Sequence, residues 1–552
     1  MPGRIRNPIL PGFNPDPSIL RVGDDYYIAT STFEWYPGVQ IHHSRDLIHW
    51  RLLTRPLRRE SQLNMLGDPD SCGVWAPCLS YSDGLFWLAY TDVKRYGRTS
   101  QGGASGAGWR DTHNYLVASP RIDGDWPDPV YLNSSGFDPS LFHDDDGRKY
   151  LVNMLLDHRP GHNRFGGIVL QEYSPAERKL VGPIHNIFKG TSIGFTEGPH
   201  LYKRNGYYYL LTAEGGTGWG HAVTMARSRE LIGPYELHPD THILTARHRP
   251  DIELQRAGHA DLVETQNGET YLVHLCGRPL PNRGRCTLGR ETAIQPMVWS
   301  QDDWLRTSDG AGLPYTEVAA PALSQHPFPA SSEREDFESP ALPLDLQWLR
   351  SPWPEELFSL TARPGFLRLY GRETLGSHFR QSLVARRQQA HCYHAETVME
   401  FEPDRYQQMA GLICYYNSSK FHYLYVSQDE DLGKYVQVWS CVPDQPQPDV
   451  FGAPAAIPAG EPIHLRVEVD FERLYFAYRV GDREWTRLGP LDASILSDEA
   501  SAPGTPNFTG AFVGVCCQDL GGTGRHADFD YFEYRERSYL ADPFKQGVAA
   551  QK

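Results

Sequence analysis

Three acidic residues occupy corresponding places in a repeated sequence pattern, Asp16 in NPDPS, Asp138 in GFDPS and Glu197 in TEGPH. An acid beside proline commonly caps a turn, but three carboxyl groups in one buried funnel would perturb one another's pKa values, as catalytic groups do. One carboxyl group can protonate the leaving oxygen of a glycosidic bond while another activates water or attacks the anomeric carbon. The third can hold the pKa of the acid up. These residues therefore predict hydrolysis of a glycosidic bond.

The elements that position these acids form a sequence repeat in the first three hundred residues. In each unit a short strand leads into a glycine turn, and an aromatic, β-rich run follows the turn. The five turns recur at intervals of 59 to 63 residues, at Gly23, Gly84, Gly147, Gly206 and Gly268. Each unit has room for about four strands, which is the content of a propeller blade. We therefore predict a five-bladed β-propeller over residues 1–320.

The repeat also aligns the chemistry. Counting back from each hairpin glycine gives five positions of the same strand phase: Asp16, Trp75, Asp138, Glu197 and His259. Because the first strand of each propeller blade lines the central axis, we expect these side chains to meet at one end of the channel.

Composition and charge exclude several classes of protein. The formal net charge of −15 opposes binding to nucleic acid or to an anionic membrane. The N-terminal segment has no apolar stretch for a signal peptide or membrane span, so a cytoplasmic location is expected. The nine cysteines include no CxxC pair, which indicates neither a disulfide framework nor a zinc site.

A second domain follows the propeller. The segment 321–332 is rich in proline and serine and is predicted to be a linker. Residues 333–552 carry strand-like runs separated by turns, which favours an antiparallel β-sandwich. The whole chain is thus predicted to be all-β. A sandwich of this kind could be a carbohydrate-binding module, because fold alone does not fix function.

Eight motifs in order give the chain a resemblance to a known family. NPDPSI, WAPCLSY, GFDPSLFHD, TEGPHLY, AEGGT, GHADLVE, LGRETAIQ and the run from Thr30 to Trp50 resemble glycoside hydrolase family 43, in particular its two-domain β-xylosidases with a C-terminal concanavalin-like sandwich. The resemblance implies that Asp16 is the general base and Glu197 the general acid. It assigns Asp138 to setting the pKa of the acid and orienting it.

The resemblance also implies a set of substrate-binding residues, namely Arg290, Phe33, Trp75, His259, Thr217 and Phe508. Phe508 belongs to the sandwich and would extend into the pocket of the propeller. No cofactor is required and no metal ligand is assigned. A structural or activating Ca²⁺ near the propeller axis is compatible with the resemblance, but one histidine cannot supply the six to eight oxygens, roughly, that Ca²⁺ prefers.

The activity implied by the resemblance is that of an exo-acting, inverting β-xylosidase, which releases xylose from the non-reducing end of xylo-oligosaccharides. Side activity on α-L-arabinofuranosyl groups is expected, and the alternatives are a main activity on those groups or a non-catalytic sugar-binding propeller. A homo-oligomer, dimer or tetramer, is also implied. Leu156 stands where close relatives carry an aromatic residue, so the platform for the second sugar is expected to be weaker or supplied elsewhere.

Overall fold

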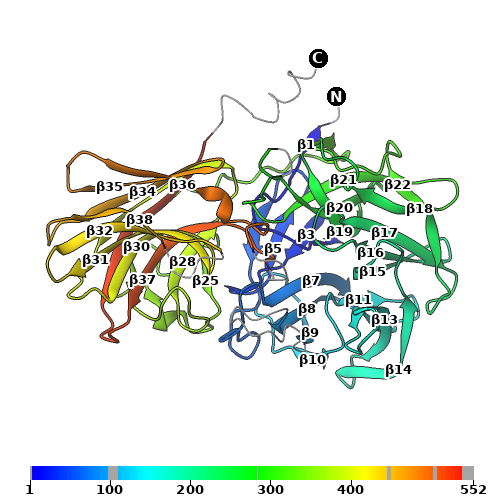
Figure 1. Ribbon diagram of the computed structural model, residues 1–552. Helices are drawn as coiled ribbons and strands as arrows, with labels where there is room; N and C mark the ends of the chain where they lie inside the picture. Colours follow the sequence, from blue (N-terminus) through cyan, green and yellow to red (C-terminus); the bar gives the residue numbers. More distant parts are fainter. Residues whose placement is uncertain (1–2, 97–109, 282–283, 444–448, 502–506, 538–552) are drawn as a thin grey trace, which may run out of the picture.

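The protein folds into two β domains that lie side by side (Figure 1). The structure is a computed structural model that describes residues 3–96, 110–281, 284–443, 449–501 and 507–537. Helix is confined in these ranges to two short 3-10 segments, η1 (Pro354–Glu356) and η2 (Ala493–Ile495). No helix of this described part is long and apolar enough to cross a membrane. The prediction of an all-β chain is confirmed.

Five antiparallel four-stranded sheets form the blades of the first domain, as the repeat predicts. Their strands, in chain order, are β2 (Ser18–Val22), β3 (Asp25–Thr30), β5 (Gln40–Ser44) and β6 (Arg51–Thr54); β7 (Gly73–Ser82), β8 (Leu85–Arg95), β9 (Asp111–Ser119) and β10 (Val130–Asn133); β11 (Ser140–His143), β12 (Lys149–Leu156), β13 (Phe165–Ser174) and β14 (Lys179–Phe188); β15 (Glu197–Arg204), β16 (Tyr207–Glu214), β17 (Ala222–Ser228) and β18 (Glu236–Thr245); β19 (Gln255–Glu264), β20 (Thr270–Gly277), β21 (Glu291–Trp299) and β22 (Leu305–Thr307).

The five repeated glycines lie in the hairpins between the first two strands of the blades. All five have a left-handed φ between 64° and 85°, a conformation that costs glycine little because it has no Cβ. The ends of the domain meet where β1 (Arg4–Arg6) pairs with β23 (Glu317–Ala319). The five-bladed propeller is therefore confirmed.

The alignment of the innermost strands differs from the sequence-based one in two blades. A left-handed φ falls on Asp16, Ala76, Asp138, Gly198 and His259, the true equivalents. Trp75 and Glu197 each lie one residue before the equivalent position, which is Ala76 in the second blade and Gly198 in the fourth. Counting back from the hairpin glycine was therefore wrong in these two blades. The reason is hairpin length, because the turn from His143 to Lys149 is longer than the two-residue turn from Arg204 to Tyr207.

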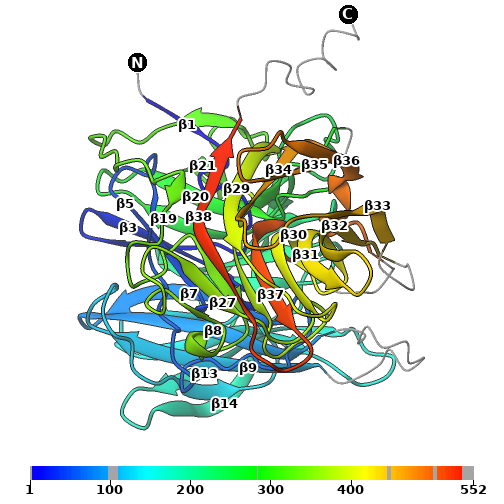
Figure 2. The same cartoon turned by 90° about the vertical axis from the view of Figure 1, so that its left-hand side faces the viewer.

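Two eight-stranded sheets make the second domain, which faces the viewer in Figure 2. One sheet contains β24 (Arg334–Glu335), β26 (Phe358–Ser359), β27 (Leu367–Tyr370), β29 (Cys392–Glu400), β34 (Ile463–Asp470), β35 (Arg473–Val480), β36 (Thr486–Asp492) and β38 (His526–Glu536). The other contains β4 (Trp35–Tyr36), β25 (Gln347–Leu349), β28 (Ser382–Arg387), β30 (Gln408–Asn417), β31 (Lys420–Asp429), β32 (Gly433–Cys441), β33 (Asp449–Ala456) and β37 (Phe512–Asp519). Buried and part-exposed residues alternate along β32 and β34, as expected of strands with one face on a core. The sandwich prediction is confirmed.

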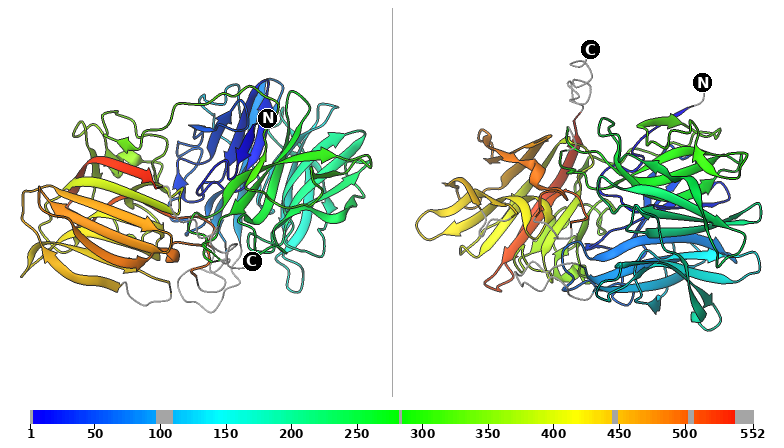
Figure 3. Two further views of the ribbon diagram at one scale, coloured as in Figure 1. Left: turned by 90° about the horizontal axis from the view of Figure 1, so that it is seen from above. Right: turned by 45° about the vertical axis from the view of Figure 1, so that its right-hand side comes forward.

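The two domains share a sheet and a hydrophobic core. The short strand β4 belongs in sequence to the first blade, yet it pairs with β25 of the sandwich. Trp35 of β4 stacks on Phe512 of β37 with ring centroids 3.7 Å apart. Figure 3 shows from two further sides that the propeller and the sandwich lie against each other. An interface of this kind fixes the two domains relative to one another.

A buried ionic group reinforces the same interface. Arg350 of the sandwich is fully buried, and its Nη2 lies 2.9 Å from Asp70 Oδ1 of the propeller. Its Nε donates to the carbonyl oxygen of Asp68 at 2.7 Å, and its backbone N–H donates to the carbonyl oxygen of Glu34 at 2.9 Å. Because a buried charge without partners is costly, these contacts with two propeller segments tie the propeller to the sandwich.

Candidate active site

All nine residues that the sequence singled out line one pocket of about 220 Å³ at the propeller axis. They come from all five blades and from the sandwich: Asp16, Phe33, Trp75, Asp138, Glu197, Thr217, His259, Arg290 and Phe508. The structure thus brings together the residues named by the repeat and those named by resemblance. Their individual roles stay predictions and are taken up below.

Asp16 is held by hydrogen bonds at both carboxylate oxygens. It precedes β2 by two residues, is 5% exposed, and adopts a left-handed φ of 55°. Arg290 Nη1 lies 2.7 Å from its Oδ1, and Ser31 Oγ donates to its Oδ2 at 2.7 Å. The Ser31 hydroxyl is oriented in turn, because it accepts the backbone N–H of Ala76 at 2.7 Å. The carboxylate of Asp16 is thus held by one charged donor and one neutral donor.

Asp138 and Glu197 form a second, coupled pair of carboxyl groups. Burial and the charge of Asp16 raise the pKa of Asp138. Burial, Asp138 and Asp16 together raise the pKa of Glu197 well above its ordinary value. The backbone N–H of Gly198 donates to Asp138 Oδ2 at 2.9 Å, which favours the ionised form of Asp138. We therefore place the shared proton on Glu197.

Arg290 is the cation that balances the three acids. It directly precedes β21 and is 2% exposed. Besides Asp16 it contacts the sandwich, since its Nη2 donates to the carbonyl oxygen of Phe508 at 2.9 Å. Its guanidinium carbon lies 5.3 Å from the centre of the Phe33 ring. The second domain therefore helps to orient the arginine that pairs with Asp16.

His259 lies beside the acids as a neutral imidazole. Its Nδ1 is 3.9 Å from Asp16 Oδ1, and burial lowers its pKa to about 4. The ring packs on Gly198, where an added Cβ would come within 3.0 Å of His259 Cε1. Glycine at this position allows both the left-handed φ of 56° and the close approach of the imidazole.

Aromatic rings form one wall of the pocket. Trp75 lies 5.5 Å from Phe33 and 5.4 Å from Phe508, the latter nearly perpendicular at 83°. The backbone N–H of Phe508 donates to Ser71 Oγ at 3.1 Å, and the carbonyl oxygen of Ser71 accepts the indole N–H of Trp75 at 3.0 Å. Apolar ring faces of this kind suit the C–H faces of a sugar.

Six further lining residues were missed by the sequence reasoning: Tyr96, Arg110, Phe137, Phe165, Phe195 and Gly216. Phe137 precedes Asp138 inside the GFDPS motif, so the motif itself contained a signal for it. Gly216 lies likewise inside the AEGGT motif. Arg110 stacks over Tyr96 at 4.2 Å, and Phe195, which is 54% exposed, meets Phe165 edge to face at 5.1 Å.

The residues near the propeller axis can be compared with what a Ca²⁺ site requires. Where the described residues are concerned, no three His, Cys, Asp or Glu side chains group as metal ligands. The small cavity on the axis below Asp16, Asp138 and His259 measures about 10 Å³, which is room for roughly one water molecule. A hydrated Ca²⁺ does not fit this cavity, and no catalytic step below is assigned to a metal.

A five-bladed propeller whose axial pocket gathers three carboxyl groups, an arginine and aromatic walls has the fold and the site of a glycoside hydrolase. The chain belongs to glycosyl hydrolases family 43, which it matches over residues 5–305. Residues 334–535 match the beta xylosidase C-terminal concanavalin A-like domain. The predicted family is confirmed, whereas the exact limits 1–320, 321–332 and 333–552 stay predictions.

Several known proteins are similar to this chain over nearly its full length and theirs. The Xylosidase/arabinosidase 43B of Humicola insolens is 53% identical, over 98% of this chain and 99% of that protein. The Xylan 1,3-beta-xylosidase of a Vibrio species is 48% identical, over 96% and 99%. The crystal structure of xylan beta-1,4-xylosidase from Bacillus halodurans C-125 superposes with a TM-score of 0.92 at 53% identity, covering 96% of this chain and 100% of that one.

Proposed function

We propose that this glycoside hydrolase is an exo-acting, inverting β-xylosidase that removes terminal xylose from short xylo-oligosaccharides. The observation that carries the proposal is the small axial pocket, in which Asp16, paired with Arg290, and Glu197, whose pKa is raised, lie behind an aromatic wall. At about 220 Å³ it is smaller than the ~300–1,000 Å³ typical of pockets for drug-sized ligands. Such a pocket suits one terminal sugar better than the middle of a polymer.

In the proposed mechanism the two carboxyl groups act on opposite sides of the glycosidic bond. Glu197 donates its proton to the leaving oxygen, and Asp16 accepts a proton from the water that attacks the anomeric carbon. Asp138 remains ionised and keeps the pKa of Glu197 high, so that the acid is protonated near neutral pH. Arg290 holds Asp16 and can also donate to sugar hydroxyls.

A second sugar would lie at the mouth of the pocket. Leu156 is aliphatic and is not among the residues that line the pocket, although it pairs with the lining residue Phe165 at the end of the β12–β13 ladder. Phe195 is exposed and lines the same pocket, so we propose that it supplies the platform for the second sugar. Phe195→Ala should raise the KM for xylobiose and leave that for nitrophenyl xyloside nearly unchanged. Equal effects on the two substrates would remove Phe195 from this role.

A main activity on arabinofuranosides is the second candidate. One relative is named for both activities, as a xylosidase/arabinosidase. The linkage is also open, since one relative is named for β-1,3 and another for β-1,4 xylan. Of these alternatives we favour β-1,4-xylosides, with arabinofuranosides as side substrates.

Specificity constants decide among these substrates. We would compare nitrophenyl β-D-xylopyranoside with nitrophenyl α-L-arabinofuranoside, and β-1,4-xylobiose with its β-1,3 isomer. The proposal expects the larger kcat/KM on the xyloside and on the β-1,4 isomer, and α-xylose as the first product by NMR. A much larger kcat/KM on the arabinoside would reverse the ranking of substrates, and β-xylose as first product would contradict inversion.

The cellular location is a further part of the proposal. All nine cysteines are free thiols, and eight of them are buried. A protein with many free thiols suits a reducing compartment, so we propose the cytoplasm.

A further inference from the structure

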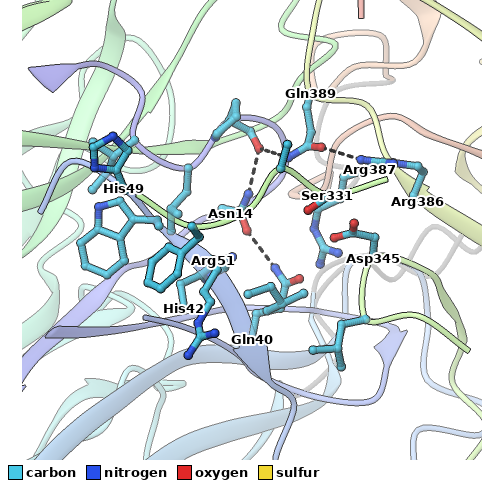
Figure 4. Close-up of a pocket in the computed structure, with 18 of the residues that line it drawn as sticks. Asn14, Gln40, His42, His49, Arg51, Ser331, Asp345, Arg386, Arg387 and Gln389 are labelled. Atoms are coloured by element: carbon cyan, nitrogen blue, oxygen red, sulfur yellow. Dashed lines mark hydrogen bonds between the residues drawn. The ribbon is translucent and has the colours of Figure 1, made fainter. Parts of the chain in front are cut away.

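A second, larger cavity of about 590 Å³ lies between the domains, away from the active-site pocket. Blade 1 contributes Gln40, His42 and Arg51, the sandwich contributes Asp345, Arg386 and Arg387, and the linker segment contributes Ser331 (Figure 4). Its volume falls within the range of roughly 300–1,000 Å³ that is usual for small-molecule sites.

The cavity is lined by a cluster of four arginines: Arg51, Arg55, Arg386 and Arg387. Two of them, Arg55 and Arg387, are only 4% and 6% exposed. Asp345 is the one acidic residue among the lining residues. Within the described part of the chain, no carboxylate oxygen lies within 4 Å of any of the four guanidinium groups. With one aspartate for four arginines, the cavity therefore keeps an excess of positive charge in a protein whose net charge is −15.

Other arginines of low exposure in this chain have a carboxylate partner within 4 Å. Arg256 pairs with Asp498 at 3.0 Å, and Arg278 pairs with Glu291 at 2.7 Å. Arg290 and Arg350 likewise have carboxylate partners. Buried charges are normally paired, because an unpaired one loses its hydration without compensation. Four arginines that share a single acidic neighbour, Asp345, therefore indicate a site for a further anion.

Neutral groups hold the buried arginines in place without neutralising them. Arg55 Nη2 donates to Gln40 Oε1 at 2.7 Å, and Arg387 Nε donates to the carbonyl oxygen of Phe13 at 2.6 Å. Arg55 Nε and Arg387 Nη2 remain buried without a hydrogen-bond acceptor among the described residues. Burial lowers the pKa of Arg55 to about 9, and burial together with Arg55 lowers the pKa of Arg387, although Asp345 opposes both shifts. Each direction shows that a negative charge here would be stabilising.

We propose that this interdomain cavity binds a small oxyanion, either a phosphate or the carboxylate of an acidic sugar, through the arginine cluster. Guanidinium groups match phosphate and carboxylate oxygens by paired hydrogen bonds. The rings of Trp50 and Phe328 also line the cavity, beside Arg51. Their apolar faces could pack against the ring of an acidic sugar, whereas inorganic phosphate has no apolar part to pack against them.

Calorimetric titration of the full chain tests the proposal. Inorganic phosphate and D-glucuronate would be titrated separately at constant ionic strength, with xylose present to fill the active site. The proposal expects one site for at least one of the two anions, and tighter binding of glucuronate would identify the sugar acid as the better ligand. No binding of either anion at millimolar concentration would overturn it.

Variants locate the binding in the cavity. Arg51→Gln and Arg386→Gln should each weaken anion binding about tenfold, the loss expected for one charge-assisted hydrogen bond. Asp345→Asn removes the acidic lining residue and should tighten binding. Arg473→Gln is the matched control, because this exposed arginine lies on β35 outside the cavity. Equal weakening by Arg473→Gln, or no response to Arg51→Gln and Arg386→Gln, would refute the site.

Discussion

Replacement of Asp138 by asparagine should change the pH profile through Glu197. The Gly198 N–H that contacts Asp138 belongs to the residue after Glu197, so the two carboxyl groups are close neighbours. At a separation of roughly 6–8 Å and an effective dielectric constant of about 20, one negative charge contributes about 2–3 kcal/mol, or roughly 1.5–2 pKa units. Asp138→Asn removes that charge, so the pKa of Glu197 falls.

The direction of the effect follows from the role of the acid. Glu197 is active when protonated, and a lower pKa means that it loses its proton at lower pH. The alkaline limb of the kcat/KM profile on xylobiose should therefore move down by roughly 1.5–2 pH units. Asp145→Asn is the matched control on the same blade, since the Asp145 side chain is 80% exposed. If activity falls in Asp138→Asn while the limb stays in place, Asp138 only positions the substrate.

Three further outcomes are expected. Glu197→Gln cannot donate a proton, so kcat on xylobiose should fall far more than on nitrophenyl xyloside, whereas Asp16→Asn should lower both by several orders of magnitude. Gly198→Ala forces a left-handed φ at a cost of about 1–2 kcal/mol and presses on His259, so both Tm and kcat/KM should drop. Arg350→Met removes the arginine partner of Asp70, which keeps its contacts with Ser418 and His378, and should lower the free energy of unfolding by about 3 kcal/mol in denaturant titration.

Each of these outcomes has a contrary result. Equal slowing of both substrates by Glu197→Gln would mean that another group is the acid. Gly194→Ala is the control for backbone strain, because Gly194 has a φ of 80° and open space around it. If it costs as much activity as Gly198→Ala, the contact with His259 has no catalytic importance. An unchanged unfolding midpoint in Arg350→Met would show that the ion pair adds nothing to the interface.

The blades could be predicted from the sequence because their signals are local. A glycine in a tight hairpin and the aromatic strand after it lie within ten residues, so all five hairpins were placed correctly. The register of Glu197 could not be predicted by counting, because it depends on how many residues each hairpin loop holds. The motif around it still placed it in the site.

Other features depend on contacts that no local pattern encodes. Strand β4 has two residues, and only its partner β25, more than three hundred residues later, makes it a strand. Phe195 lies outside the strands, and nothing in the repeat marks it. The arginine cluster contains residues 51 and 55 and residues 386 and 387, which lie more than three hundred residues apart in the sequence. Its concentration of charge therefore cannot be recognised before the fold is known.

The pairing of β4 with β25 has a consequence for the order in which the protein matures during synthesis. Asp16 and β4 are synthesised more than three hundred residues before Gln347–Leu349, the strand with which β4 must pair. The pocket then waits for Phe508, whose carbonyl oxygen accepts from Arg290. A nascent chain can therefore close its propeller by pairing β1 with β23 and still lack the last wall of its catalytic pocket. We therefore expect activity only after synthesis has passed Phe508, so products that end before it carry all three acids and stay inactive.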